Sequence, residues 1–63
     1  MKRIWLKNLR LSAGLSQTDL AALSEITRQY YSHIETGKRR PSPIVAKRIA
    51  KILDFEWYKL LDQ

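Results

Sequence analysis

Residues 16–37 read SQTDLAALSEITRQYYSHIETG, a segment that contains two short helical patterns separated by a turn. Ser16 precedes the first pattern, and Asp19 follows it by three positions. This is the capping-box pattern, in which the serine hydroxyl and the acidic side chain satisfy free amides at the start of a helix. We therefore predict a helix over residues 17–24. Its predicted inward-facing residues are Leu20, Ala21 and Ser24.

The second pattern begins after Thr27, a residue type favoured at helix N-caps, and ends at Gly37, the type favoured just past a helix end. Glu25 and Ile26 form the turn between the two patterns. On a helical wheel the second helix separates into an apolar face and a polar face. The apolar face consists of Tyr30, Tyr31 and Ile34, and the polar face consists of Arg28, Gln29, Ser32, His33 and Thr36.

Helical patterns also flank this segment on both sides. Residues 3–13 contain neither glycine nor proline, and Gly14 ends that pattern. Ser42-Pro43 supplies an N-cap followed by proline at the first helical position, which predicts a helix over residues 43–53. A short last helix is predicted near residues 56–61. The predicted core stripe of the helix before it is Ala46, Ile49, Ala50 and Leu53.

The composition limits the classes of protein to which the chain can belong. Its 63 residues suffice for one domain, and without cysteine it has neither disulfides nor a thiolate metal site. Charges interrupt the apolar residues near the N-terminus, so we expect a cytoplasmic protein with no membrane partner. One histidine and six scattered carboxylates argue against an enzyme, a metal site, a cofactor or a small-molecule ligand. The net charge of +6 favours a polyanionic partner.

Three segments, LKNLR (6–10), GLSQTDLA (14–21) and IETGKRRPS (34–42), resemble the phage repressor and Cro-like helix-turn-helix family. Several anchors recur at the family's spacing, and the match covers nearly the whole chain. The resemblance implies an all-α domain over residues 1–63, a compact bundle of five short helices. It also implies that the second and third helices bind double-stranded DNA, with the N-terminal half of the third helix in the major groove.

A protein that reads the sequence of double-stranded DNA needs a polar helical face with cations beside it. The major groove is wide enough for one helix, and phosphates flank it. The polar face of the predicted third helix fits this requirement. The guanidinium of Arg28 can bridge guanine O6 and N7, and the amide of Gln29 can pair with adenine N6 and N7. By position in the family, the expected base-reading residues are Arg28, Gln29, Ser32 and His33. For His33 the open alternative is a solvated side chain.

Cationic and polar residues on both sides of that helix are expected to contact DNA phosphates. Gln17 occupies the start of the second helix, where the helix dipole attracts anions and where the family commonly uses such a glutamine. The expected set is Gln17, Thr27, Lys38, Arg39 and Arg40, with Lys2, Arg3 and Lys7 as weaker candidates. The alternative for each of these side chains is an ordinary solvated residue.

Two charged residues are assigned to the fold rather than to DNA. In similar proteins, the positions of Arg10 and Glu35 form an ion pair that ties the first helix to the end of the third. The resemblance therefore implies a structural ion pair between these two side chains.

The chain departs from the family pattern at several positions. Glu25 occupies a turn position where the family commonly has glycine, because a positive φ is often needed there, so a strained or reshaped turn is expected. Asp54 likewise replaces a common glycine before the last helix. Tyr30 and Tyr31 replace a small residue and a β-branched aliphatic one. We predict that both tyrosines belong to the core, the alternative being that they stack on bases.

A single recognition helix reads too few base pairs to select one site in a genome, since each mismatch costs only about 1 to 3 kcal/mol. A homodimer on a palindromic operator, with half-sites about 34 Å apart, is therefore expected. Apolar residues outside the core stripe mark the expected interface, namely Ile44, Val45, Ile52, Trp57, Tyr58 and Leu61. Trp57 and Leu61 have the alternative role of closing the core, and Leu11 with Leu23 form an alternative interface.

Together these features predict a sequence-specific transcriptional regulator, with repression as the expected activity. The alternative is an antitoxin that neutralises a toxin protein and represses its own operon. It ranks lower because the chain ends within a few residues of the last helix, which leaves no tail to wrap around a partner.

Overall fold

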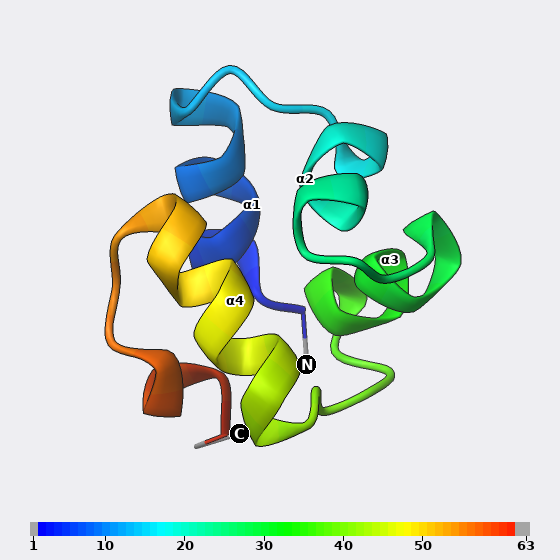
Figure 1. The fold of residues 1–63 in the computed structure, drawn as a ribbon, viewed down its shortest axis with the longest axis vertical. Coiled ribbons are helices and arrows are strands. Elements are labelled where there is room, and N and C mark those ends of the chain that lie inside the picture. Colours follow the sequence, from blue (N-terminus) through cyan, green and yellow to red (C-terminus); the bar gives the residue numbers. More distant parts are fainter. Residues whose placement is uncertain (1, 62–63) are drawn as a thin grey trace.

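The computed structural model describes residues 2–61, so the predicted domain bounds 1–63 include residues 1, 62 and 63, which lie outside the described part. Helices follow one another along the chain (Figure 1). Their bounds are Ile4–Ser12 for α1, Gln17–Leu23 for α2, Arg28–Thr36 for α3, Pro43–Leu53 for α4 and Trp57–Leu61 for the 3-10 helix η1. The predicted all-α fold of five short helices is confirmed, with no strand among residues 2–61.

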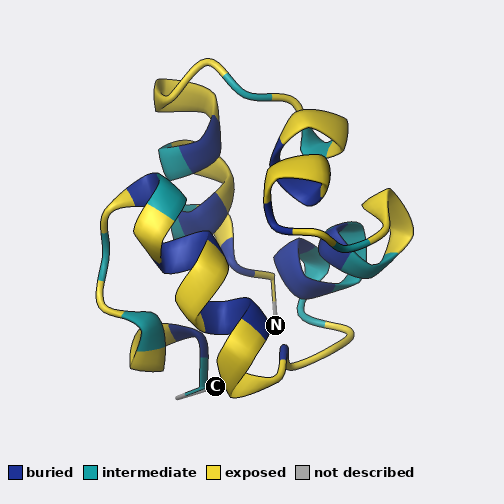
Figure 2. Cartoon of the chain, viewed as in Figure 1, coloured by how far each residue is buried: buried dark blue, intermediate teal, exposed yellow. Residues whose placement is uncertain are grey.

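The five helical elements enclose one hydrophobic core. α2 and α3 lie next to each other as the helix-turn-helix, α1 packs against α3, and η1 folds back onto α4 (Figure 1). Figure 2 shows the buried segments of these helices turned toward the middle of the molecule. The largest fully buried apolar side chains are Tyr31, Leu6, Leu20, Ile34, Ile49 and Leu60.

Local side-chain chemistry sets the helix starts. The Ser16 hydroxyl accepts the Asp19 amide at 3.0 Å and the Asp19 carboxylate accepts the Ser16 amide at 3.1 Å, so the predicted capping box is confirmed. Thr27 and Ser42 cap α3 and α4 with their hydroxyls, which accept backbone amides at 3.0 and 3.3 Å. Gly37 ends α3 with a φ of 83°, a conformation that glycine adopts without strain.

Some of the apolar residues that lie outside the predicted core stripe of α4 are nevertheless buried in the core. The expectation that Val45 belongs to a dimer interface is wrong, because its side chain is 8% exposed and packs in the core. Val45 and Ile49 are four residues apart, a spacing that places both on one face of a helix. Ile44 and Tyr58, in contrast, are 64% and 53% exposed. The other expected interface residues, which are half-buried against the core, are Ile52, Trp57 and Leu61.

The turn between α2 and α3 holds Glu25 in a backbone conformation that usually favours glycine. Glu25 has a φ of 61°, in the left-handed region, and Asp54 at the end of α4 has the same φ. These are the two positions at which the family commonly has glycine. A left-handed conformation costs a residue with a side chain roughly 1 to 2 kcal/mol. The turn is therefore strained at Glu25, as one of the two expected alternatives states.

A buried ion pair joins α1 to α3. Arg10 Nε and Nη2 donate to the two carboxylate oxygens of Glu35 at 2.8 and 3.2 Å, and both residues are 6% exposed. Arg10 Nη1 also donates to the Leu15 carbonyl, and the Gln17 amide donates to Glu35, so the same cluster holds the start of α2. Burial alone would raise the pKa of Glu35, but Arg10, Tyr31 and Gln17 outweigh burial and hold this pKa below its ordinary value.

Arg3 is a second buried arginine, at 2% exposure. Its guanidinium donates to the backbone carbonyls of Ile34, Arg39 and Leu60. The expectation that Arg3 contacts DNA is therefore wrong, because its donors serve the end of α3, the loop after it and η1. Burial, followed by the nearby charge of Arg40, lowers the pKa of Arg3.

Glu35→Gln is expected to destabilise the fold strongly. The substitution leaves the Arg10 guanidinium buried without its counter-charge, which costs about 3 to 5 kcal/mol of unfolding free energy. A domain of this size holds roughly 3 to 5 kcal/mol in total, so a largely unfolded variant agrees with the expectation. Urea unfolding followed by circular dichroism measures the effect. Glu56→Gln changes an exposed carboxylate and is the matched control, and equal stability of the two variants would contradict the prediction.

The same cluster predicts a dependence of stability on pH. The folded pKa of Glu35 lies below its ordinary value of 4.5, so the ionised carboxylate stabilises the fold above that pH. This stabilisation is lost as the pH falls through the folded pKa. Urea unfolding at decreasing pH should show the loss, and an NMR titration assigns it to the Glu35 carboxyl group. A titration of that group at or above pH 4.5 would sink the prediction.

Glu25→Gly is expected to stabilise the protein. Glycine removes the strain of the left-handed turn but adds freedom to the unfolded chain, and the balance is a gain of about 0.5 to 1 kcal/mol. Thermal unfolding measures the gain. Ala22→Gly is the matched control, because Ala22 is exposed inside α2 and glycine there should cost about 0.5 to 1 kcal/mol. If both variants lose stability, the turn at Glu25 is not strained.

Candidate nucleic-acid interface

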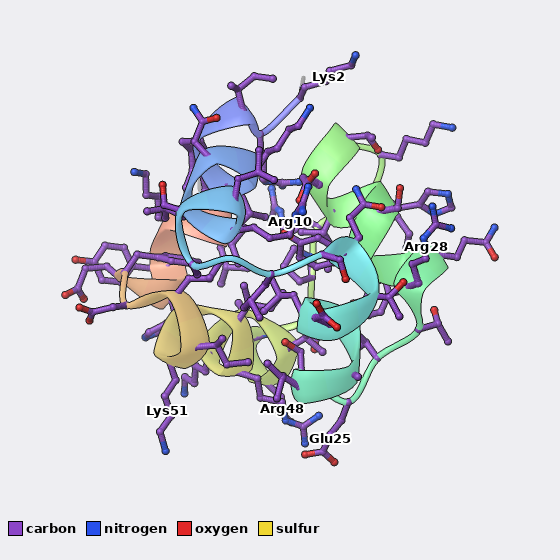
Figure 3. All side chains as sticks on the ribbon, turned by 90° about the horizontal axis from the view of Figure 1, so that it is seen from above. Lys2, Arg10, Glu25, Arg28, Arg48 and Lys51 are labelled. Atoms are coloured by element: carbon purple, nitrogen blue, oxygen red, sulfur yellow. The ribbon has the colours of Figure 1, made fainter. Side chains whose placement is uncertain are left out.

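The expected base-reading residues lie together on the outer face of α3. They are Arg28 and Gln29, which are exposed, and Ser32 and His33, which are half-buried. Figure 3 shows Arg28 pointing away from the body of the molecule. The opposite face of α3 is buried in the core. α3 can therefore present all four side chains to a partner without a change in the fold.

A hollow of about 420 Å³ lies beside this face, and its lining comes from α3, the α3 N-cap and the loop after α3. The lining residues are Thr27, Gln29, Tyr30, His33 and Arg39. The Arg39 amide donates to the His33 carbonyl at 3.1 Å, which folds the loop back onto the helix. The Arg39 guanidinium lies over the Tyr30 ring, 5.4 Å from its centroid. The hollow thus contains a cation and several hydrogen-bond donors and no carboxylate.

The basic loop after α3 is accessible. Lys38, Arg39 and Arg40 are exposed, and the buried Pro41 then anchors the loop to the rest of the fold. Thr27, at the opposite end of α3, is also exposed, and its hydroxyl caps the helix. The expected phosphate-contacting residues of this region therefore lie at both ends of α3.

Gln17, at the start of α2, belongs to a second hollow. Its side-chain amide donates to Glu35 at 3.1 Å, so the buried ion pair orients it. Lys2 and Lys7 are exposed nearby, and together with Thr36 they contribute to the lining of this hollow, which has a volume of about 290 Å³. Cations are thus available beside α1 and α2 as well as in the loop after α3.

Tyr30 packs against the core as predicted but is less buried than Tyr31. Tyr31 is fully buried, which confirms the prediction for that ring, but Tyr30 is only half-buried. The Tyr30 ring packs against the core and also lies beneath the Arg39 guanidinium, and its hydroxyl accepts the Ser42 amide at 3.4 Å. No sequence pattern indicates this arrangement, because it depends on how the loop after α3 folds back.

Within residues 2–61, no group of three or more His, Cys, Asp and Glu side chains is placed to hold a metal ion. The described helices also include none with the length and apolar character needed to cross a membrane. The outer face of α3 and the loop after it carry hydrogen-bonding groups and positive charge.

Comparison with known proteins gives the family. A family model described as helix-turn-helix matches residues 6–60. An uncharacterized HTH-type transcriptional regulator, YqaF of Bacillus subtilis (strain 168), is 47% identical over 57 residues, which cover 90% of this chain and 75% of that protein. The chain therefore belongs to the phage repressor and Cro-like helix-turn-helix family of DNA-binding transcriptional regulators.

Proposed function

We propose that this protein binds double-stranded DNA in a sequence-specific manner and represses transcription. The observation that carries the proposal is the accessible polar face of α3 with cations near both of its sides. The major groove of B-DNA admits one α-helix and displays a different pattern of donors and acceptors for each base pair, so a polar helical face can read it. The N-terminal half of α3 enters the groove, as is usual for helix-turn-helix proteins.

Arg28 and Gln29 are the principal base-reading residues in this proposal. Both are exposed in the first turn of α3, at the end that leads into the groove. A guanidinium pairs with guanine O6 and N7, and a side-chain amide pairs with adenine N6 and N7. Ser32 and His33 follow one turn later on the same face and read neighbouring base pairs.

Positive charge beside α3 holds the DNA backbone. Contacts to phosphates release counterions, so they supply affinity that falls as salt rises and that is independent of sequence. The residues proposed for these charged contacts are Lys38, Arg39 and Arg40, and the neutral Gln17 and Thr27 are proposed to add hydrogen bonds to phosphates.

Two copies of the chain bind together, because one short helix cannot select a single site in a genome. Ile44 on α4 and Tyr58 on η1 support an interface at these two elements, since they are large apolar side chains exposed by 64% and 53%. Leu11 and Leu23, exposed by 55% and 57%, support the alternative interface at α1 and α2. Either arrangement gives a two-fold dimer that matches a palindromic operator.

Arg28→Ala is expected to weaken binding to the preferred site and to relax the preference at one base pair in each half-site. Loss of a bidentate contact costs about 1 to 3 kcal/mol, or roughly 5- to 150-fold in affinity. Selection from random duplex DNA identifies the preferred site of the parent protein. Fluorescence anisotropy then measures both proteins on that site and on its single-base variants.

Lys51→Ala is the matched control for this measurement. It removes the same charge from an exposed position on α4, which Figure 3 places on the opposite side of the molecule from Arg28. The control should bind all sequences slightly less tightly and keep the base preferences of the parent. If Arg28→Ala also keeps every base preference, Arg28 does not read a base.

The selected site is expected to be an inverted repeat with half-site centres about 34 Å apart. Ile44→Glu should weaken self-association about tenfold or more, because a two-fold interface brings the new charge near its own copy. Glutamate in the first turn of α4 is favourable for the helix dipole, so the helix is retained. Sedimentation equilibrium measures the change, and Leu23→Glu tests the alternative interface. A site without two-fold symmetry would argue against the dimer.

A further inference from the structure

Arg39, in the loop after α3, is held from several directions. Its amide donates to the His33 carbonyl at 3.1 Å, and its carbonyl accepts from the Nη1 atom of Arg3 at 3.1 Å. Its guanidinium lies over the Tyr30 ring at 5.4 Å from the centroid. Both the backbone and the side chain of this exposed residue are therefore positioned before any partner arrives.

The ring beneath the guanidinium is itself fixed. Tyr30 packs against the core, and its hydroxyl accepts the Ser42 amide just before α4. The ring thus has a defined place relative to both α3 and α4. A cation over such a ring gains about 0.5 to 1 kcal/mol at an exposed site, which favours one orientation of the arginine side chain.

A guanidinium carries five N–H donors, and a cation–π contact with one ring does not use them all. Among residues 2–61, no acceptor forms a hydrogen bond with the Arg39 guanidinium. The side chains around it in the hollow carry a hydroxyl, an amide and an imidazole, and none is a carboxylate. The free donors of Arg39 therefore border a space that suits an anion with two oxygens to share.

We propose that this hollow is a preformed site for one phosphodiester group of the DNA backbone, bound by Arg39 and positioned by Tyr30. The inference rests on the proposed function and adds to it a defined site and a positioning role for Tyr30. A phosphodiester fits better than a stacked base, because the Arg39 guanidinium already lies over the Tyr30 ring. Two anionic oxygens match the fork of an arginine.

Preorganisation gives the proposal a measurable consequence. An arginine whose side chain moves freely in water loses side-chain entropy when it binds a phosphate, whereas an arginine already held over a ring has lost part of that entropy beforehand. Tyr30→Leu keeps an apolar side chain against the core and removes the aromatic ring beneath the Arg39 guanidinium. It should weaken DNA binding by roughly three- to tenfold, although the charge that meets the phosphate is unchanged.

A double-mutant cycle tests this coupling on the full chain. Fluorescence anisotropy over a salt series compares the parent, Tyr30→Phe, Tyr30→Leu, Arg39→Ala and the double variant Tyr30→Leu with Arg39→Ala, on the selected operator and on a duplex of mixed sequence. Arg39→Ala should reduce the slope of log affinity against log salt by about 0.9 for each bound copy of the chain, or by about 1.8 for the proposed dimer. Tyr30→Leu should leave the slope unchanged and should have less than about a twofold effect once Arg39 is absent. Tyr30→Phe keeps the ring and should stay within about twofold of the parent.

A second measurement does not depend on any change at Tyr30. Phosphates of the selected operator are replaced one at a time by uncharged methylphosphonates. One position in each half-site should weaken binding of the parent and have no effect on Arg39→Ala. Thermal unfolding of every variant ensures that each protein is folded at the temperature of the binding measurements.

The outcomes separate the inference from the function on which it rests. If the parent protein binds neither duplex, both the proposed function and the inference about Tyr30 and Arg39 are overturned. A parent that binds, together with independent effects of Tyr30→Leu and Arg39→Ala, overturns the inference alone, and it would mean that Tyr30 touches DNA or serves only the fold. The inference is also overturned if every methylphosphonate substitution weakens binding of the parent and of Arg39→Ala to the same extent.

Discussion

Three helices meet at the ion pair between Arg10 and Glu35, and the direction in which the polar face of α3 points follows from that contact. Arg10 belongs to α1, Glu35 lies in the last turn of α3, and Gln17 at the start of α2 donates to the same carboxylate. Removing two ions from water is costly, and here hydrogen bonds to both partners offset that cost. Because the Glu35 side chain is fixed, the rotation of α3 about its own axis is fixed as well. The buried side of α3 thereby determines which side chains face outward.

Arg3 has a corresponding role for the loop after α3. The last carbonyls of a helix have no partner within the helix, and Arg3 donates to one of them at Ile34. The same guanidinium reaches Arg39 and Leu60, across sequence separations of 36 and 57 residues. A chain of 63 residues without cysteine cannot make such long links with disulfides. Buried arginines with several donors make them instead.

The features that can be predicted from this sequence are those set by neighbouring residues. Caps at Ser16 and Thr27 act within one turn, so the helix starts agree with the structure, and the wheel of α3 places the polar face correctly. The roles of Arg3 and Tyr30 depend on contacts with distant segments, and no local pattern contains them. Val45 is an intermediate case, because its spacing from the core stripe already indicates burial. The ion pair between Arg10 and Glu35 is predicted only by the family resemblance, because the two residues are 25 positions apart in the sequence.

Burial divides the arginines into two groups that respond differently to salt. Arg3 and Arg10 are shielded from solvent, so dissolved ions screen their contacts only weakly. Arg28 and Arg39 are exposed, and in the proposed complex their attraction to DNA falls as salt rises. The two groups are connected, because Arg3 holds the backbone of Arg39. Buried contacts that salt screens only weakly therefore hold the exposed residues proposed to bind DNA, so we expect their arrangement to persist at salt concentrations that weaken the proposed complex.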